Sequence, residues 1–289
     1  MKIYMNGKLV DKADAKVSVF DHGFLYGDGA FEGIRSYNSR VFRLKEHMDR
    51  LYETMHTLMI APRMTKREMS GAVVSTLRAN KIKDGYIRVI VSRGDGDLGL
   101  DPRKCFGQPN VIIIADKINL YPPQLYQKGM EIITVATCKN HPNALNPQLK
   151  SLNYLNNILA KIEASLSGYN EAIMLQDNGY IGECTGDNVF IYRDGVLSTP
   201  HLGSLKGITC SAILELALKM KIKVFEGYIT RHEVYNAEEC FLTGTAAELI
   251  PIVKVDGRVI GTGKPGLVTK KLLGAFHQLT KKDGVKYDV

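Results

Sequence analysis

The stretch Leu149-Lys150-Ser151-Leu152-Asn153-Tyr154 lies near the middle of a chain of 289 residues. It places a lysine between a strand-like region and an apolar helix, which we expect over residues 153–167 because Leu155, Leu159 and Ile162 recur at helical spacing. Partial desolvation at such a boundary lowers the pKa of a lysine and makes its amine a nucleophile for carbonyl carbon. Taken alone, the segment equally fits an ordinary surface lysine at a helix start.

Before this lysine, short strands and two helices are expected. Thr65 is predicted to N-cap the second helix, with Glu68 completing a capping box. A glycine-punctuated turn occupies residues 22–29, and a loop rich in glycine and aspartate occupies residues 93–102. The predicted strands are residues 2–5, 8–13, 31–37, 86–92 and 110–116, and the first helix covers residues 43–58.

After the lysine, strands are expected to form hairpins, with Asp177-Asn178-Gly179 as one turn. Thr209 is predicted to N-cap a helix, and a last helix starts near residue 268. The predicted strands after the lysine are residues 171–176, 188–192, 239–243 and 251–255, and one more, residues 130–137, precedes the lysine at the start of the second half of the chain.

Antiparallel hairpins and segregated helices together indicate an α+β fold. Pro122-Pro123 interrupts all periodicity, so a linker is expected nearby. We expect residues 1–117 to form a small N-terminal domain, residues 118–129 a linker, and residues 130–289 a larger domain.

Composition excludes several classes of function. The chain has 38 Lys and Arg against 30 Asp and Glu, a formal net charge of +8, but these residues are scattered rather than gathered in a stripe, so no nucleic-acid partner is expected. Five cysteines without a Cys-x-x-Cys pair favour reduced thiols and no metal site. Apolar runs fall short of the ~20 residues of a membrane helix, and no apolar leader opens the chain. We therefore expect no membrane partner and a cytoplasmic location.

Three further segments offer parts of a site for an anionic cofactor. In Glu183-Cys184-Thr185-Gly186-Asp187-Asn188 a carboxylate can hold a heterocyclic nitrogen protonated, or it is a solvated turn residue. Leu205-Lys206-Gly207-Ile208-Thr209 runs into a helix whose N–H groups can bind phosphate, or its threonine is merely an N-cap. In Gly244-Thr245-Ala246-Ala247-Glu248 small residues let backbone N–H groups approach an anion, or they form an ordinary tight turn.

Taken together and in order, these segments resemble one family, the class IV aminotransferases. These are pyridoxal-phosphate enzymes of fold type IV, which have two domains as in the D-amino-acid aminotransferases. Within the class, Phe31-Glu32-Gly33-Ile34-Arg35 and Tyr86-Ile87-Arg88 are similar to the branched-chain amino acid aminotransferases. Two more segments share the resemblance, Glu46-His47-Met48-Asp49-Arg50-Leu51 and Lys150-Ser151-Leu152-Asn153-Tyr154-Leu155-Asn156.

The resemblance implies pyridoxal 5′-phosphate as cofactor and a set of residues that bind it. Lys150 matches the catalytic lysine that holds the cofactor covalently, Glu183 the carboxylate that pairs with its pyridine nitrogen, and Tyr154 the tyrosine that bonds its 3′ oxygen. Asp187 departs from the glutamate that branched-chain enzymes often have. The groups around the phosphate match Arg50, Ile208, Thr209 and Thr245, and the other cofactor-binding positions are Gly186, Asp187, Leu205, Gly207 and Gly244.

The resemblance also implies the substrate site and the assembly. Tyr26 and Leu100 match residues that reach in from a partner subunit of a homodimer, or of a hexamer built of dimers. No metal is implied. The remaining substrate-binding positions are Phe31 in the apolar pocket, Tyr86 and Arg88 near the substrate carboxylate, Arg35, and the backbone of Thr245 and Ala246.

The expected reaction is transamination of L-leucine, L-isoleucine and L-valine with 2-oxoglutarate, as in branched-chain amino acid biosynthesis. Two enzymes of the same fold are alternatives: a D-amino-acid aminotransferase, and an aminodeoxychorismate lyase, which uses the same lysine for elimination. A basic binding protein without activity is the third. The sequence does not rank the three branched donors or exclude aromatic ones, because one methylene changes a pocket's preference by only ~1–3 kcal/mol.

Overall fold

The computed structural model describes residues 1–117 and 121–289, which fold as two units, each with its own sheet and core. Of the described residues, the first unit comprises 1–117, Leu149–Tyr154 and Thr280–Val289, and the second comprises 121–148 and Leu155–Leu279. Each unit mixes antiparallel strands with helices, so the predicted α+β class is confirmed. The first three residues of the predicted linker, 118–120, lie outside the described residues.

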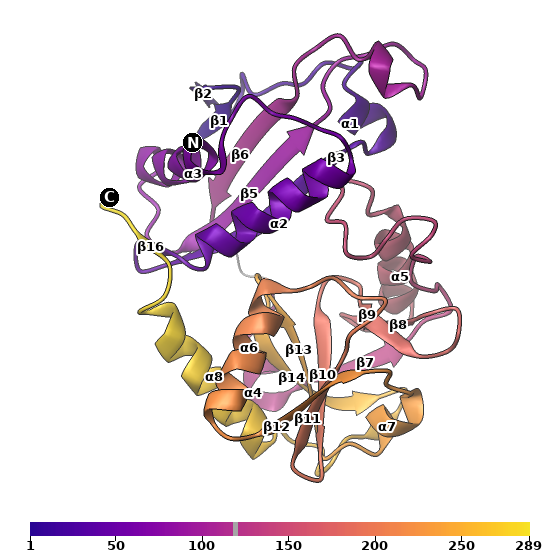
Figure 1. The fold of residues 1–289 in the computed structure, drawn as a ribbon. Coiled ribbons are helices and arrows are strands. Elements are labelled where there is room, and N and C mark those ends of the chain that lie inside the picture. The colour runs from indigo at the N-terminus through magenta and orange to yellow at the C-terminus, as the bar shows by residue number, and fades with distance from the viewer. Residues whose placement is uncertain (118–120) are drawn as a thin grey trace. The chain divides into compact units, whose positions relative to one another are not determined.

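The first unit is built on an antiparallel sheet that has seven strands among the described residues (Figure 1). Side chains alternate between the two faces of each strand. In the order of the sheet the strands are β16 (Val285–Lys286), β4 (Arg40–Val41), β3 (Gly29–Tyr37), β5 (Gly85–Ser92), β6 (Asn110–Asp116), β1 (Lys2–Met5) and β2 (Lys8–Asp11).

Helices α2 (Leu44–Thr57) and α3 (Lys66–Ala79) cover one face of this sheet (Figure 1). The predicted capping box is confirmed: Thr65 accepts from the backbone of Glu68, whose side chain accepts from Thr65 in return. The core of the unit lies between helices and strands and includes Ile34, Leu51, Met55, Met69, Val73, Leu77, Ile87, Val89 and Ile113. Helices α2 and α3 do not cover the opposite face of β3 and β5, and the side chains on that face are described below.

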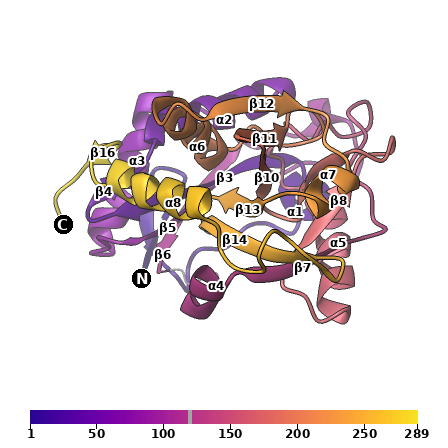
Figure 2. The ribbon, with the colours of Figure 1, turned by 90° about the horizontal axis from the view of Figure 1, so that it is seen from below.

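The second unit holds a mixed sheet of nine strands among the residues described, and Figure 2 shows four of them, β10, β13, β14 and β7, side by side. Neighbours pair in parallel at β12–β11, β14–β7 and β7–β8 and antiparallel elsewhere. In order the strands are β12 (Lys223–Gly227), β11 (Val196–Pro200), β10 (Asn188–Arg193), β13 (Glu239–Gly244), β14 (Glu248–Val255), β7 (Met130–Thr134), β8 (Ala172–Leu175) and β9 (Ile181–Cys184), with β15 (Arg258–Val259) beside β14.

Helices complete the second unit around a core that includes Ile132, Ile173, Val189, Leu242, Ile250 and Ile252. Among them, α6 contacts β12 and β13. The helices are α4 (Pro123–Lys128), α5 (Leu155–Leu166), α6 (Ile208–Lys219), α7 (Arg231–Tyr235) and α8 (Leu267–Thr280).

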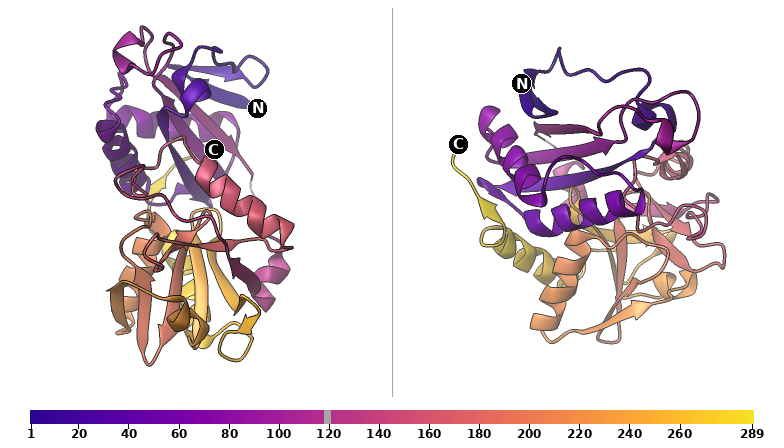
Figure 3. Two further views of the ribbon diagram at one scale, coloured as in Figure 1. Left: turned by 90° about the vertical axis from the view of Figure 1, so that its right-hand side faces the viewer. Right: turned by 45° about the horizontal axis from the view of Figure 1, so that its top comes forward.

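Helix α5 follows the candidate lysine segment, as predicted, but its apolar side does not face the core. The side of α5 that packs against the core carries the small residues Ala160 and Ala164. Figure 3 shows α5, drawn in pink, on the outside of the sheet of its own unit. The apolar side chains that stay exposed on it are Leu155, Ile158, Leu159, Ile162 and Leu166, the last at 84%.

Several short elements were not predicted from the sequence. The glycine-punctuated turn contains a helix, α1 (His22–Tyr26), and the described part of the predicted linker contains α4. Strands β9, β11 and β12 were also missed, because four or five residues carry too little periodicity to stand out. Of the helices described, none is both long and apolar enough to cross a membrane.

Candidate functional site

In the first unit, the backbone of Lys150 is tied to both β3 and α2. Its carbonyl accepts from the N–H of Phe31 at 3.0 Å, and its N–H donates to the hydroxyl of Thr54 at 3.3 Å. Ala30 and Ser151 form an isolated bridge beside it. The lysine therefore sits at a fixed register on the edge of a sheet strand, rather than on a free loop.

The amine of Lys150 lies against aromatic groups. Its Nζ donates to the hydroxyl of Tyr154 at 3.2 Å and lies 4.6 Å from the centre of the Phe31 ring. The rings of Phe31 and Tyr154 meet edge to face, with centres 5.0 Å apart. A hydrogen bond and a ring contact therefore hold the amine of Lys150 beside two aromatic side chains.

Two further candidates lie on the same face of the sheet, because β3 and β5 pair Gly33 with Arg88 and Arg35 with Tyr86. The guanidinium of Arg88 donates to the hydroxyl of Tyr86 at 3.1 Å and lies 4.5 Å above the Phe31 ring. Burial raises the pKa of Tyr86, so its hydroxyl stays protonated. The structure thus brings a cation and aromatic surface together beside Phe31.

A glycine makes this packing possible. A Cβ atom on Gly33 would lie 2.0 Å from the hydroxyl of Tyr86, which is far too close for any side chain. The arginine that follows in the motif, Arg35, lies over the ring of Tyr37 at 5.0 Å and points along the same face.

Arg50 lies on the other face of the sheet, on helix α2. Its side chain is nine-tenths buried and donates from Nε and Nη2 to the two carboxylate oxygens of Glu32, at 2.7 and 2.8 Å. His47 donates to the same carboxylate from Nδ1 at 2.7 Å. Neither Glu32 nor His47 was a candidate from the sequence, although both stand inside segments that carry the family resemblance.

In the second unit, Glu183 lies near the end of β9 with its carboxylate buried and fully engaged. Oε1 lies 2.5 Å from Nζ of Lys139, while Oε2 accepts from the N–H of Leu205 at 2.9 Å and from the side chain of Asn188 at 3.4 Å. It is not a solvated turn residue. Lys139 was not predicted from the sequence, because nothing in its own segment marks it.

The N-terminus of α6 lies close to this carboxylate, since Asn188 also donates to the carbonyl of Leu205 at 2.9 Å. Gly207, not Thr209, is the N-cap of α6, and no side chain caps the helix. The predicted N-cap was therefore wrong: Thr209 lies inside the first turn, buried, because Gly207 adopts the extended cap conformation. An α-helix without a side-chain cap offers its first N–H groups to an anion.

The turn between β13 and β14 carries Thr245 and Ala246, both half-buried, in the same unit. A Cβ atom on Gly244 would lie 1.9 Å from Oδ1 of Asp187, so glycine lets this aspartate pack against the turn. Asp187 is buried, whereas Gly186 beside it is exposed. The absence of a side chain at Gly244 therefore allows an oxygen atom to lie close to the backbone of the turn.

One buried hydroxyl in this region has no partner. Thr243 is fully buried on β13, directly opposite Asn188 of β10, and its Oγ1 makes no hydrogen bond with any residue that the structure describes. Unpaired buried hydroxyls are rare in folded proteins. Together with the uncapped helix, it fits a site built for a polar ligand.

Tyr26 and the loop that carries Leu100 lie together in the first unit. The hydroxyl of Tyr26 donates to the carbonyl of Leu98 at 2.5 Å, and His22 of α1 bonds the carbonyl of Asp97 at 2.8 Å. Leu98 and Leu100 are exposed at 69% and 79%. The turn and the loop thus form one apolar projection.

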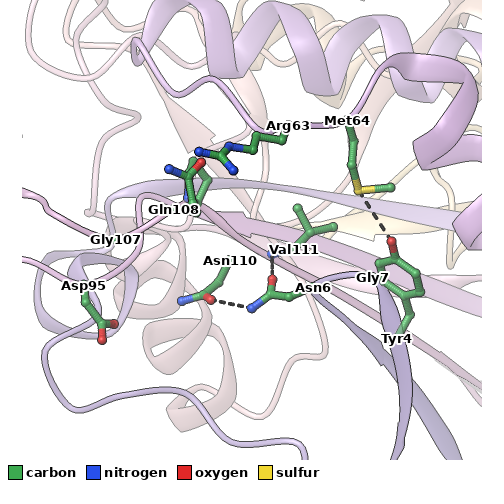
Figure 4. Close-up of a pocket in the computed structure, with 11 residues that line it drawn as sticks. Tyr4, Asn6, Gly7, Arg63, Met64, Asp95, Gly107, Gln108, Asn110 and Val111 are labelled. Atoms are coloured by element: carbon green, nitrogen blue, oxygen red, sulfur yellow. Dashed lines mark hydrogen bonds between the residues drawn. The ribbon is translucent and has the colours of Figure 1, made fainter.

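A cavity of about 560 Å³ in the first unit is lined by none of these candidates. In Figure 4, Asn6 and Asn110 on its wall bond each other at 2.8 Å, and Tyr4 donates to the sulfur of Met64 at 3.6 Å. In the part of the chain that the structure describes, no group of His, Cys, Asp and Glu could hold a metal ion.

Comparison with known proteins bears on both units. Residues 29–255 match the family model described as "Amino-transferase class IV". A protein of Methanocaldococcus jannaschii is 52% identical over 291 residues, covering 100% of both chains.

Solved structures agree with the family match. The branched-chain amino acid aminotransferase of Escherichia coli has a TM-score of 0.94 and 36% identity, and the match covers 99% of this chain and 97% of that one. The branched-chain amino acid aminotransferase of Thermobaculum terrenum, solved in its PLP form, has a TM-score of 0.88 and 28% identity. That match covers 96% of this chain and 93% of the other.

Proposed function

Because the chain belongs to the class IV aminotransferases, we propose that it transfers the amino group of branched-chain L-amino acids to 2-oxoglutarate. L-Leucine, L-isoleucine and L-valine are the donors, and branched 2-oxo acids and L-glutamate are the products. The observation that carries the proposal is the amine of Lys150, held between Phe31 and Tyr154 on the sheet face that presents Arg88. The names of the Escherichia coli and Thermobaculum terrenum neighbours support it.

Pyridoxal 5′-phosphate is the cofactor of this family, and when bound it supplies an electron sink for the substrate's Cα. The donor set of the chain fits its functional groups. Lys150 offers an amine for its aldehyde, Glu183 a carboxylate for its pyridine nitrogen, and Tyr154 a hydroxyl for its 3′ oxygen. For the phosphate we propose Arg50, Ile208, Thr209 and Thr245, and for the rest of the cofactor Gly186, Asp187, Leu205, Gly207 and Gly244.

Lys150 has two tasks in this reaction. It holds the cofactor in the resting enzyme, and it takes the proton from Cα of the bound amino acid as a general base. The hydrogen bond to Tyr154 and the ring of Phe31 hold its amine in one orientation. The buried carboxylate of Glu183, bonded by the N–H of Leu205, is held in place for the ring nitrogen.

The substrate binds, in this proposal, on the face of β3 and β5. Phe31 and Tyr86 supply apolar area for a branched side chain, and Arg88 supplies a cation for a carboxylate. The backbone of Thr245 and Ala246 assists, and Arg35 stands next along the strand. One pocket must accept both a branched side chain and the second carboxylate of glutamate, and Arg88 beside an aromatic surface offers both kinds of contact.

We further propose that the working unit is a homodimer, alone or within a hexamer, in which Tyr26 and Leu100 complete the partner's substrate site. Leu100, exposed at 79%, is more stable when buried against a second copy. The exposed apolar side of α5 supports assembly as well. The cytoplasm is the proposed location, since all five cysteines are free thiols.

Borohydride reduction followed by peptide mapping tests the proposal. The cofactor should be fixed on Lys150, and Lys150→Ala should lose transamination, whereas Lys8→Ala, which removes an exposed lysine of β2, should not. Label on any other lysine would overturn the assignment. Substrate profiling then tests specificity: faster turnover of D-alanine than of every branched L-amino acid would favour a D-amino-acid aminotransferase instead.

A further inference from the structure

A buried carboxylate links the first sheet to its covering helix. Glu32 lies on β3, is 0% exposed, and accepts three hydrogen bonds from α2: two from Arg50 and one from His47. The two donors stand three residues apart on the helix, so they present one face to the strand. Glu32, His47 and Arg50 thus form a hydrogen-bonded cluster in which Glu32 is the common acceptor.

The charges of this cluster are settled by its contacts. Burial alone would raise the pKa of Glu32, but Arg50 and His47 lower it from 4.5 to about 2, so the carboxylate is ionised. Burial lowers the pKa of His47 despite the neighbouring carboxylate, so its ring is neutral at neutral pH. A neutral histidine donates from Nδ1 only as that tautomer, which the short contact to Glu32 requires.

The cluster fixes the guanidinium of Arg50 in one plane. Nε and Nη2 bind the two oxygens of one carboxylate, a forked geometry that allows little rotation. His47 donates to one of the same oxygens, so the carboxylate itself cannot turn. Apolar side chains in place of these three residues would often stabilise the core equally well. Stability alone therefore does not account for the cluster.

The same two elements also hold the candidate lysine. Lys150 bonds the backbone of Phe31, next to Glu32 on β3, and the hydroxyl of Thr54, one turn after Arg50 on α2. A link between Glu32 and Arg50 therefore sets the position of the arginine relative to the lysine.

We propose that Glu32 and His47 are positioning residues that hold Arg50 for the phosphate of the cofactor. This inference rests on the proposed function, in which Arg50 contacts that phosphate. The cluster orders the guanidinium of Arg50 before the ligand binds. Binding therefore avoids the conformational-entropy cost of immobilising a flexible side chain. Its contribution should appear in the binding of phosphate, not in the binding of the pyridine ring.

Two ligands separate these contributions: pyridoxal 5′-phosphate and pyridoxal, which lacks the phosphate. The dissociation constants of both are measured by titrating the full-length protein after its cofactor has been removed. The quantity of interest is the ratio of the pyridoxal constant to the pyridoxal-phosphate constant. A change in general folding moves both constants, whereas a change in phosphate binding moves the ratio.

Arg50→Ala calibrates the experiment and should lower this ratio by about 10- to 100-fold, as expected for a lost charge-assisted hydrogen bond. Glu32→Gln should lower it by about tenfold, with the pyridoxal constant changed by less than about threefold. His47→Leu should lower the ratio as well. His47→Asn, which keeps an N–H donor near the position of Nδ1, should restore it.

The outcomes distinguish two kinds of failure. An unchanged ratio in Arg50→Ala would refute the phosphate role of Arg50, and the positioning role with it. A lowered ratio in Arg50→Ala but not in Glu32→Gln would refute the positioning role alone. If Glu32→Gln does not fold, the two His47 variants decide: equal ratios in His47→Leu and the wild type, or no recovery in His47→Asn, would overturn the inference.

Discussion

The ammonium nitrogen of Lys139 lies 2.5 Å from Oε1 of Glu183, and both side chains are at least nine-tenths buried. The pair belongs to the second unit, where Glu183 also accepts from the backbone of Leu205. A buried ion pair is costly to break, because removing one partner leaves the other charge without compensation. Lys139 therefore affects how firmly the proposed cofactor-binding carboxylate is held.

We expect Lys139→Met to lower the free energy of unfolding by about 3–5 kcal/mol, since Glu183 would keep a buried charge without its cation. Urea denaturation followed by circular dichroism measures the loss. Lys139→Arg retains the charge and should lose much less. A methionine variant within about 1 kcal/mol of the wild type would show that the pair is not a stabilising contact.

Replacement of Glu183 by glutamine tests its proposed role in the reaction. The amide keeps most of the shape of the carboxylate but not its charge, so we expect the variant to keep its cofactor and lose the rate of amino transfer by about 100-fold or more. Single-turnover absorbance with L-leucine measures the rate separately from cofactor content. A rate close to that of the wild type would remove Glu183 from the site.

Gly33→Ala should disturb the proposed substrate face directly. The added Cβ would lie 2.0 Å from the hydroxyl of Tyr86, so the ring must move and break its bond with Arg88. We expect a loss of about 1–3 kcal/mol in stability and a raised KM for amino donors. Gly71→Ala is the matched control, because nothing lies within 4 Å of its added Cβ on α3 and alanine favours a helix.

Glu32 should make the free energy of unfolding depend on pH in the acid range. Its pKa is about 2 in the folded state against an ordinary value of 4.5, so the unfolded state binds the proton more readily. Its contribution, on the order of 3 kcal/mol, is present above pH 4.5 and is lost as the pH falls toward 2.

Comparison of the wild type with Glu32→Gln isolates this contribution from that of other carboxyl groups. The difference in unfolding free energy should be constant above about pH 5 and shrink at lower pH. A difference that stays constant down to about pH 3 would contradict an ionised, bonded Glu32.

Local patterns in the sequence predicted local structure well. Thr65 and Glu68 mark a helix start through contacts between near neighbours in the chain, and the structure contains that capping box. The period of α5 likewise predicted a helix, but not which side of it would be buried. Periodicity reports spacing along one element, whereas burial depends on what packs against it.

Contacts between distant segments were beyond the sequence. Lys139 stands in an irregular segment, and its partner Glu183 lies on a four-residue strand that was itself missed. Thr209 has the residue type of an N-cap, yet the glycine two positions earlier takes that place, because the backbone there is already extended. Such choices depend on the tertiary path of the chain.

The proposed sharing of the active site between two subunits gives the last prediction. Tyr26 donates to the carbonyl of Leu98, so a hydrogen bond joins the turn to the loop that bears Leu100. In the proposed dimer this projection completes the site of the partner. Each site then needs Lys150 from one subunit and the projection from the other.

Complementation tests this arrangement. Lys150→Ala subunits and subunits with Tyr26→Ala and Leu100→Ser should each be nearly inactive alone. Mixed in equal amounts and allowed to exchange, they should recover about a quarter of the wild-type activity, because half of the dimers are hybrids with one intact site each. Mixing two batches of Lys150→Ala subunits is the control and should recover none. If mass spectrometry shows hybrid dimers and activity does not return, the projection does not serve the partner's site, and its apolar side chains only stabilise the interface.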